Sequence, residues 1–156
     1  MKITLLVVGK TSSADVKNIC ADYAKRINRY AKFEDVAVDN SSIKISDKNA
    51  MKEKEGAMLL KKISARNFVI LLDAQGKEFT SLQLADDMEN ILNRSLGNIC
   101  FVIGGAYGFS NEVYTRANAK LSLSKLTFSH QIIRIIFMEQ LYRAFTIINN
   151  APYHHE

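Results

Sequence analysis

Short apolar runs alternate along this chain with longer segments whose apolar residues recur at helical spacing, and this alternation constrains the fold most. The run at residues 3–8 is short and rich in branched side chains, as buried strands are. Ser13 or Asp15 can cap a helix, and Thr80 with Gln83 forms a capping box. We predict strands at 3–8, 33–38, 67–72, 98–103 and around Leu121 and Leu123, and helices from Ser13 or Asp15 to about residue 31, then at 50–63, 80–93, 110–118 and 130–149.

Strand–helix alternation of this kind predicts an α/β fold, with a mostly parallel sheet and helices on both of its faces. The length of 156 residues suits one domain. Sheets of this type bind their ligands beyond the carboxyl ends of the strands. We therefore expect a pocket where the chain leaves its strands, at residues 9–10, 73–76 and 104–108.

Composition and spacing exclude several classes of protein. Hydrophobic residues make up 47% of the chain, which is too many for a disordered protein. The two cysteines and three histidines show no metal-ligand or disulfide spacing, so no metal is expected, and reduced thiols fit the cytoplasm. The first apolar run is too short for a signal peptide, and charged residues interrupt the run at 132–148, so we expect a protein that neither spans nor enters a membrane.

Positive charge is concentrated in the first part of the chain. Residues 1–66 carry fourteen Lys and Arg against eight Asp and Glu, whereas residues 67–156 carry seven against eight. Such an excess is typical of a protein that contacts a polyanion, although a solvated lysine-rich surface has the same composition.

The last predicted helix is apolar around most of its circumference. A helix of this kind needs cover on two sides, and a chain this small can cover one side with its own sheet. A second copy related by two-fold symmetry is the simplest cover for the other side. Deep burial of the helix within a monomer is the alternative.

Two glycine-containing segments follow predicted strands. Gly9-Lys10-Thr11 lacks the earlier glycine of a phosphate-binding loop, because Thr4 stands at that position, and this disfavours a general nucleotide-binding domain. The segment 104–108 does not have the spacing of a dinucleotide fingerprint. Local chemistry leaves open whether it is a tight turn or a loop that approaches a ligand closely.

Several segments in order and spacing resemble the RlmH family of SPOUT-class methyltransferases. These are Leu72-Asp73 with Gly76-Lys77, Ile103-Gly104-Gly105 with Gly108, residues 121–128, His130, Arg134, residues 139–144, and Pro152-Tyr153-His154. The resemblance covers nearly the whole chain. It implies a SPOUT fold with a C-terminal trefoil knot, S-adenosylmethionine as cofactor, and a homodimer that methylates N3 of a pseudouridine in large-subunit ribosomal RNA, on the large subunit or the whole ribosome.

The resemblance also implies roles for individual residues. Leu72, Gly104 and Gly105 are expected to border the cofactor, and the segment Leu123, Ser124, Lys125, Leu126, Thr127 and Phe128 is expected to wrap its adenosyl part. Apolar side chains there can pack on adenine while backbone groups read its edge.

Three residues near the C-terminus are expected to be catalytic: His154, Tyr153 and Arg143. His154 could accept the proton that leaves the target nitrogen, and Tyr153 could stack on the base or hydrogen-bond it. Arg143 could stabilise charge on the uracil ring, although a surface pair with Glu139 is an alternative. Arg134, like Arg143, could hold an RNA phosphate or stabilise that charge. Lys10 follows the first predicted strand and is expected to contact an RNA phosphate, with an ordinary surface lysine as the alternative.

The chain departs from the family pattern at Ser129, where proline is usual, and at His155, where a basic residue is common. The first departure predicts a less rigid loop, and the second predicts one RNA-facing charge fewer. A non-catalytic ribosome-binding or assembly module on the same fold is the alternative function, and an intact cofactor segment argues against it.

Overall fold

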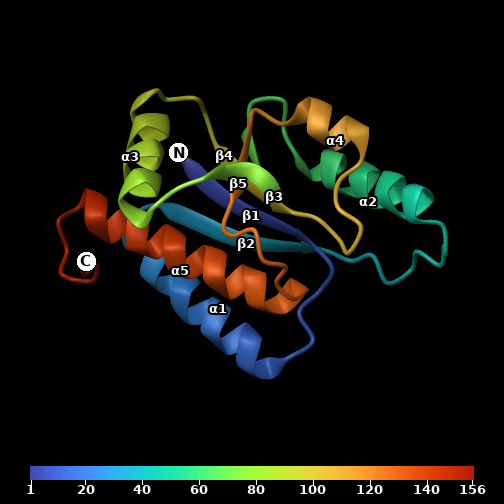
Figure 1. Ribbon diagram of the computed structural model, residues 1–156, viewed down its shortest axis with the longest axis horizontal. Coiled ribbons are helices and arrows are strands. Elements are labelled where there is room, and N and C mark those ends of the chain that lie inside the picture. The colour runs from blue at the N-terminus through green and yellow to red at the C-terminus, as the bar shows by residue number, and fades with distance from the viewer.

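The computed structural model describes residues 1–156 and contains one five-stranded parallel sheet (Figure 1). The strand order is β2-β1-β4-β3-β5, so β4 lies between β1 and β3. The elements in chain order are β1 (Lys2–Val8), α1 (Ala14–Ile27), β2 (Lys32–Val38), α2 (Lys48–Lys62), β3 (Phe68–Glu78), α3 (Ser81–Asn93), β4 (Ile99–Ile103), α4 (Asn111–Arg116), β5 (Ala119–Ser122) and α5 (His130–Ile148). The α/β prediction with a parallel sheet is confirmed.

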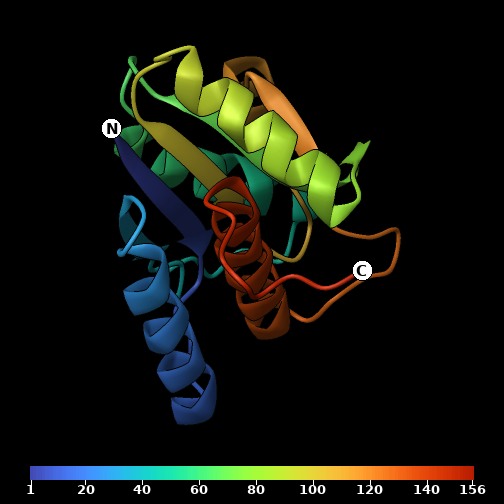
Figure 2. The ribbon, with the colours of Figure 1, turned by 90° about the vertical axis from the view of Figure 1, so that its left-hand side faces the viewer.

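Helices cover both faces of the sheet, as predicted (Figures 1 and 2). Alternate residues of β1 point to opposite faces, as the pleat of a strand requires. Ile3, Leu5 and Val7 join the larger core beneath α1, α3 and α5, whereas Leu6 and Val8 join the smaller core beneath α2 and α4. The two-sided burial explains why the strand sequence is continuously apolar.

Side-chain caps begin the helices, and those of α1 and α3 stand where the sequence pattern indicated. Ser13 accepts a hydrogen bond from the Val16 backbone N–H, and Thr80 forms the predicted capping box with Gln83. Ser129 caps α5 by accepting from the Ile132 N–H at 3.3 Å. Ser129 therefore fixes the start of α5, and the lower rigidity expected of the preceding loop stays a prediction.

The predicted end of α1 at about residue 31 is wrong, because the helix ends at Ile27. The side chain of Asn28 donates to the Ala24 carbonyl at 2.8 Å and also exchanges hydrogen bonds with the Phe33 backbone. These bonds close the helix and direct the chain into β2.

The strand predicted at 67–72 is too short, because β3 continues to Glu78 after a bulge. Beyond the bulge, Lys77 and Glu78 pair with Leu121 and Ser122 of β5. A Cβ atom on Gly76 would lie 2.7 Å from the Leu121 backbone, so only glycine permits this approach. Strand β5 ends at Ser122, and Leu123 lies outside it.

Helix α5 packs its buried side against the larger core and leaves its other side partly uncovered. Phe137, Met138 and Leu141 are fully buried, and the Phe137 ring lies 4.7 Å from that of Phe101. Ile132, in contrast, is 45% exposed. No helix of the chain combines the length and the apolar character that a membrane span requires.

The segment after β5 leads to α5 across the carboxyl ends of the strands. It starts from β5 at one edge of the sheet and ends at α5, which packs against both α1 and α3 (Figure 1). The trefoil knot depends on how this segment threads through the rest of the chain, and it stays a prediction.

Candidate functional site

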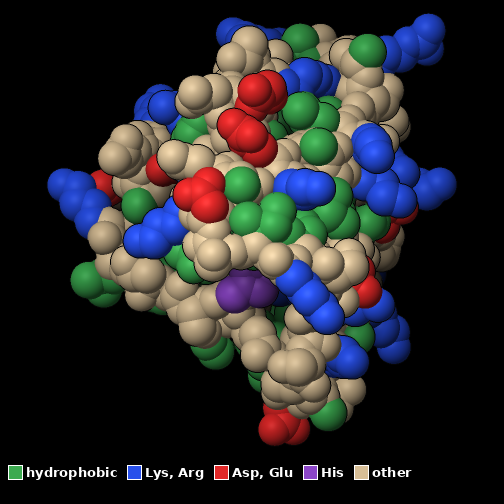
Figure 3. Space-filling view, turned by 90° about the vertical axis from the view of Figure 1, so that its right-hand side faces the viewer, with side chains coloured by type: hydrophobic (Ala, Val, Ile, Leu, Met, Phe, Trp, Pro, Cys, Tyr) green, Lys and Arg blue, Asp and Glu red, His purple; other side chains and the backbone are tan.

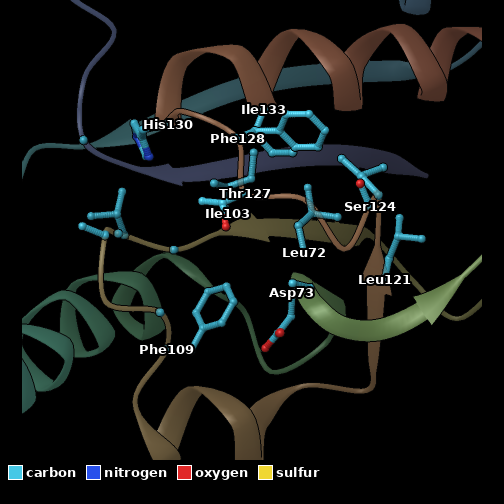
Figure 4. A pocket seen from close by; sticks show the side chains of 18 of the residues that line it. Leu72, Asp73, Ile103, Phe109, Leu121, Ser124, Thr127, Phe128, His130 and Ile133 are labelled. Carbon is cyan, nitrogen blue, oxygen red and sulfur yellow. The ribbon is translucent and has the colours of Figure 1, made fainter.

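A cavity of about 690 Å³ lies at the carboxyl ends of the strands, where the sequence predicted a pocket. Its wall is formed by Gly9 after β1, by Leu72 and Asp73 of β3, by the loop after β4, and by the segment 123–128 (Figure 4). Figure 3 shows hydrophobic side chains gathered near the middle of one face, beside a histidine and with Lys and Arg side chains around them. The volume and the mostly apolar lining are those of a small-molecule site.

The residues expected to bind the cofactor come together in this cavity, with one exception. Leu72, Gly104 and Gly105 line it, and so does all of the segment 123–128 except Lys125. The Lys125 side chain is 85% exposed and lies 3.8 Å from the Glu78 carboxylate. Lys125 therefore belongs to the segment but does not line the cavity in this structure.

The segment 123–128 carries few hydrogen bonds of its own. Ser122 Oγ donates to the Ser124 carbonyl at 3.1 Å, and the Leu126 N–H donates to Ser124 Oγ at 3.0 Å. These bonds fix the turn into the segment. The backbone N–H and C=O groups of Thr127 and Phe128 form no hydrogen bond to another backbone group. They are therefore free to bind a ligand.

The glycines at 104–108 serve both purposes that the sequence left open. The Gly108 N–H donates to the Gly105 carbonyl at 3.1 Å, and Gly108 has a φ of 84°, so the segment is a tight turn. It also lines the cavity. A Cβ on Gly105 would lie 2.8 Å from Glu55 Cδ, and one on Gly104 would lie 3.0 Å from the Phe109 ring. Larger residues would therefore close the space behind the turn.

The structure adds polar side chains to the site: Asp73 and His130, to which the sequence analysis gave no role, and Asn40, which it did not mention. Asp73 accepts a hydrogen bond from the Tyr114 hydroxyl at 2.5 Å. Burial, reinforced by this bond, raises the pKa of Tyr114 to about 12. Asn40 and His130 line the cavity at the side of Gly9. His130 belongs to the family resemblance, whereas the only sequence signal for Asn40 is its position just after a strand.

The three residues expected to be catalytic form one cluster at the C-terminal end of α5. Arg143 Nε donates to Glu139 Oε1 at 3.1 Å, and Arg143 Nη1 lies 3.2 Å from His154 Nδ1. The guanidinium carbon is 4.8 Å from the centre of the Tyr153 ring, and the Tyr153 hydroxyl donates to Glu139 Oε1 at 3.1 Å. Burial, followed by its hydrogen bonds, raises the pKa of Tyr153. The pair with Glu139 therefore exists, and it orients Arg143 toward the tail.

This cluster lies far from the cavity within a single chain. Ile133 lines the cavity, and Arg143 stands ten residues later on the same helix. At a rise of 1.5 Å per residue, the two positions are about 15 Å apart along the helix axis. The cluster and the cavity of one chain are therefore two separate places.

The two residues expected to contact RNA have different surroundings. Lys10 is 69% exposed and lies 3.1 Å from the Asp39 carboxylate, so its ammonium group is open to solvent. Arg134 is 5% exposed, pairs with Asp35 at 2.9 Å and 3.0 Å, and donates to the Thr11 hydroxyl. Its guanidinium is committed within the protein, which argues against a direct phosphate contact by Arg134.

Comparison with known proteins shows similarity along the whole chain. The model of a family described as "Predicted SPOUT methyltransferase" matches residues 1–154. Proteins named "Ribosomal RNA large subunit methyltransferase H" are 46% identical in Christiangramia forsetii, 47% in Bacteroides thetaiotaomicron and 43% in Flavobacterium psychrophilum. The alignment covers 99% of both chains in the first case and 100% of both in the other two. No group of three or more His, Cys, Asp or Glu side chains is placed to hold a metal ion.

Proposed function

The chain belongs to the SPOUT methyltransferase family, and from that premise we propose that it methylates large-subunit ribosomal RNA, at N3 of a pseudouridine, with S-adenosylmethionine as donor. The observation that carries the proposal is the cavity, which gathers the segment 123–128 and the turn 104–108 at the carboxyl ends of the strands. The name of the relatives supports the RNA target. The target atom follows from the resemblance to the RlmH family.

The cavity suits the proposed donor in size and lining. Leu72, Ile103 and Leu121 provide apolar surface for an adenine ring, and free backbone groups of the segment 123–128 can hydrogen-bond its edge. A Cβ atom on Gly104 or Gly105 would meet the Phe109 ring or the Glu55 carboxylate, so glycine lets the turn take this place in the cavity wall. When bound, the donor supplies an electrophilic methyl group on a sulfonium. The contribution of the protein is then to hold the target nitrogen in line with that methyl group.

We propose that the working enzyme is a homodimer in which the cluster of one chain meets the cavity of the other. Within one chain the two are about 15 Å apart along α5, too far for one base to touch both. Helix α5 contributes Ile133 to the cavity and Arg143 to the cluster. The side of α5 that is not covered by the rest of the chain includes the exposed Ile132. A two-fold packing of α5 against its copy would cover this side and bring each cluster toward the partner's cavity.

Within the cluster, Arg143 is the residue best placed to stabilise negative charge on the uracil ring. Glu139 holds its guanidinium, and Tyr153 packs against the guanidinium with its ring. A guanidinium only donates, so the contact with Arg143 makes His154 Nδ1 the acceptor and places the ring proton on Nε2. For His154 to take the substrate proton it must therefore first release Arg143. A His154→Ala enzyme with an unchanged rate would reject the role of proton acceptor.

Contact with the ribosomal RNA is proposed through exposed basic side chains, Lys10 among them. These contacts would be made with phosphates, and the shape of the assembled particle would select the site. Binding to ribosomes should then weaken steeply as the salt concentration rises. Binding that does not respond to salt would contradict this part of the proposal.

The test is methyl transfer from labelled S-adenosylmethionine to undermodified ribosomes, large subunits and free ribosomal RNA, measured side by side. The proposal predicts label on one nucleotide of the large-subunit RNA. Label on no substrate, with donor binding intact, would mean a different RNA target. Label on no substrate and no donor binding would favour a non-catalytic ribosome-binding module.

A further inference from the structure

One end of the cavity presents hydrogen-bond acceptors around Gly9. A Cβ atom on Gly9 would lie 3.2 Å from His130 Nε2 and 3.6 Å from Asn40 Oδ1, so these two side chains converge on the same point. Both residues line the cavity. His130 Nε2 is buried and has no hydrogen-bond partner. Figure 4 shows His130 at the opposite end of the cavity from Ser124 and Leu121.

A buried carboxylate stands behind this end of the cavity. Glu55 of α2 is only 4% exposed, and its Oε1 accepts a hydrogen bond from Asn40 Nδ2 at 3.1 Å. Its Oε2 has no partner and lies against Gly105. None of the ion pairs of the chain includes Glu55. A buried charge without a counter-charge is costly, and it is satisfied when a cation binds nearby.

Glu55 also decides how the amide of Asn40 is turned. A carboxylate only accepts hydrogen bonds, so it draws the amide NH₂ group toward itself. The carbonyl oxygen Oδ1 then points away from Glu55, where it lies near Gly9. Asn40 therefore offers the cavity an acceptor.

His130 offers the cavity a second acceptor. Burial lowers the pKa of its imidazole, against the opposing effects of the nearby Gly9 backbone and of the Glu55 charge. A neutral imidazole has one acceptor nitrogen, and the unpartnered Nε2 can serve as that acceptor. The positive charge on the next turn of α5, Arg134, is already paired with Asp35. No Lys or Arg side chain lines the cavity.

We propose that Asn40 Oδ1 and His130 Nε2 bind the α-ammonium group of the donor's amino-acid part, and that Glu55 acts behind them as a positioning residue. Glu55 fixes the amide of Asn40 and supplies the negative charge that the ammonium group neutralises. This inference rests on the proposed use of S-adenosylmethionine. With the adenosyl part at the segment 123–128, the elongated cavity directs the amino-acid part toward Asn40 and His130.

The test compares the affinities of three ligands by calorimetry: S-adenosylmethionine, S-adenosylhomocysteine and 5′-methylthioadenosine. The first two carry the α-ammonium group, and the third lacks the amino-acid part. We expect Glu55→Gln and Asn40→Leu to weaken binding of the first two by on the order of tenfold, since a charge-assisted hydrogen bond contributes about this much. Binding of 5′-methylthioadenosine should stay unchanged. Glu53→Gln is the matched control, because Glu53 is an exposed carboxylate of the same helix.

The pattern across the ligands decides the outcome. An equal loss of affinity for all three ligands would show that Glu55 only shapes the cavity. A loss of affinity for S-adenosylmethionine alone would show that the charge of Glu55 acts on the sulfonium and not on the ammonium group. Either result, or unchanged binding of all three, would overturn the inference while leaving the proposed donor in place. No binding of any ligand by the unaltered protein would overturn the proposed function as well.

Discussion

Replacing Gly105 by alanine tests the close contact between the turn at 104–108 and the carboxylate of Glu55. The added Cβ would lie 2.8 Å from Glu55 Cδ and closer still to Oε2, so either the turn or the buried side chain must move. Glu55 is held by Asn40 at 3.1 Å and has little room to retreat. Overpacking of this kind costs about 1–3 kcal/mol. The Gly105→Ala protein should therefore be less stable by about that amount, with weaker donor binding because the turn lines the cavity.

The assay is equilibrium unfolding in denaturant at one fixed protein concentration, run as a double-mutant cycle with Glu55→Ala. Truncation of Glu55 removes the atoms that the new Cβ would meet. The cost of Gly105→Ala should then fall to a few tenths of a kcal/mol in the Glu55→Ala background, well below its cost in the original protein. Equal costs in the two backgrounds would refute the steric reasoning. Gly108→Ala is the matched control, because no heavy atom lies within 4 Å of the place its Cβ would take and only the positive φ of 84° resists the change.

Three further predictions concern other parts of the structure. Asn28→Ala should lower the free energy of unfolding by about 1–2 kcal/mol, because the side chain closes α1 and joins it to β2; an unchanged denaturation midpoint would contradict this. Arg143→Lys should reduce methyl transfer by at least about tenfold without weakening donor binding measured by calorimetry, because lysine cannot hold Glu139 and His154 together; parallel losses of rate and donor affinity would contradict it. The pKa of Tyr114 is about 12 in the folded protein, above the value near 10 expected in the unfolded chain, so the stability from this shift is present below pH 10 and is lost as the pH rises toward 12. Tyr114→Phe should therefore weaken the fall of the thermal unfolding temperature over this pH range. An unaltered dependence of that temperature on pH would contradict the prediction.

The sequence predicts most helices and strands of this fold, because side-chain caps and the spacing of apolar residues determine where most of them form. The capping box at Thr80 and the caps at Ser13 and Ser110 start their helices where the sequence indicated. The extension of β3 was missed because Lys77 and Glu78 are polar, and they become strand residues only by pairing with Leu121 and Ser122 across a bulge. The order of the strands could not be predicted either, since it depends on long-range pairing.

The candidate site also contains parts that could be predicted from the sequence and parts that could not. The segment 123–128 and the turn 104–108 could be expected, the first from family resemblance and the second from glycines that follow a strand. Glu55 could not, because it stands in a helix among alternating charged residues and its sequence pattern is that of a solvated side chain. Only the packing of α2 beneath the turn brings it to Gly105 and Asn40. Residues that converge from separate elements leave no local signal.

The central claim is that methyl transfer takes place between the cavity of one chain and the Arg143 cluster of another. It is tested most directly by co-expressing two inactive variants, Gly104→Val in the cavity and Arg143→Ala in the cluster, and measuring methyl transfer to undermodified ribosomes. Random pairing makes half of the dimers mixed, and each mixed dimer holds one intact site of two, so activity should recover to about a quarter of the original value. Mixed dimers with no activity above that of either variant alone would contradict the account.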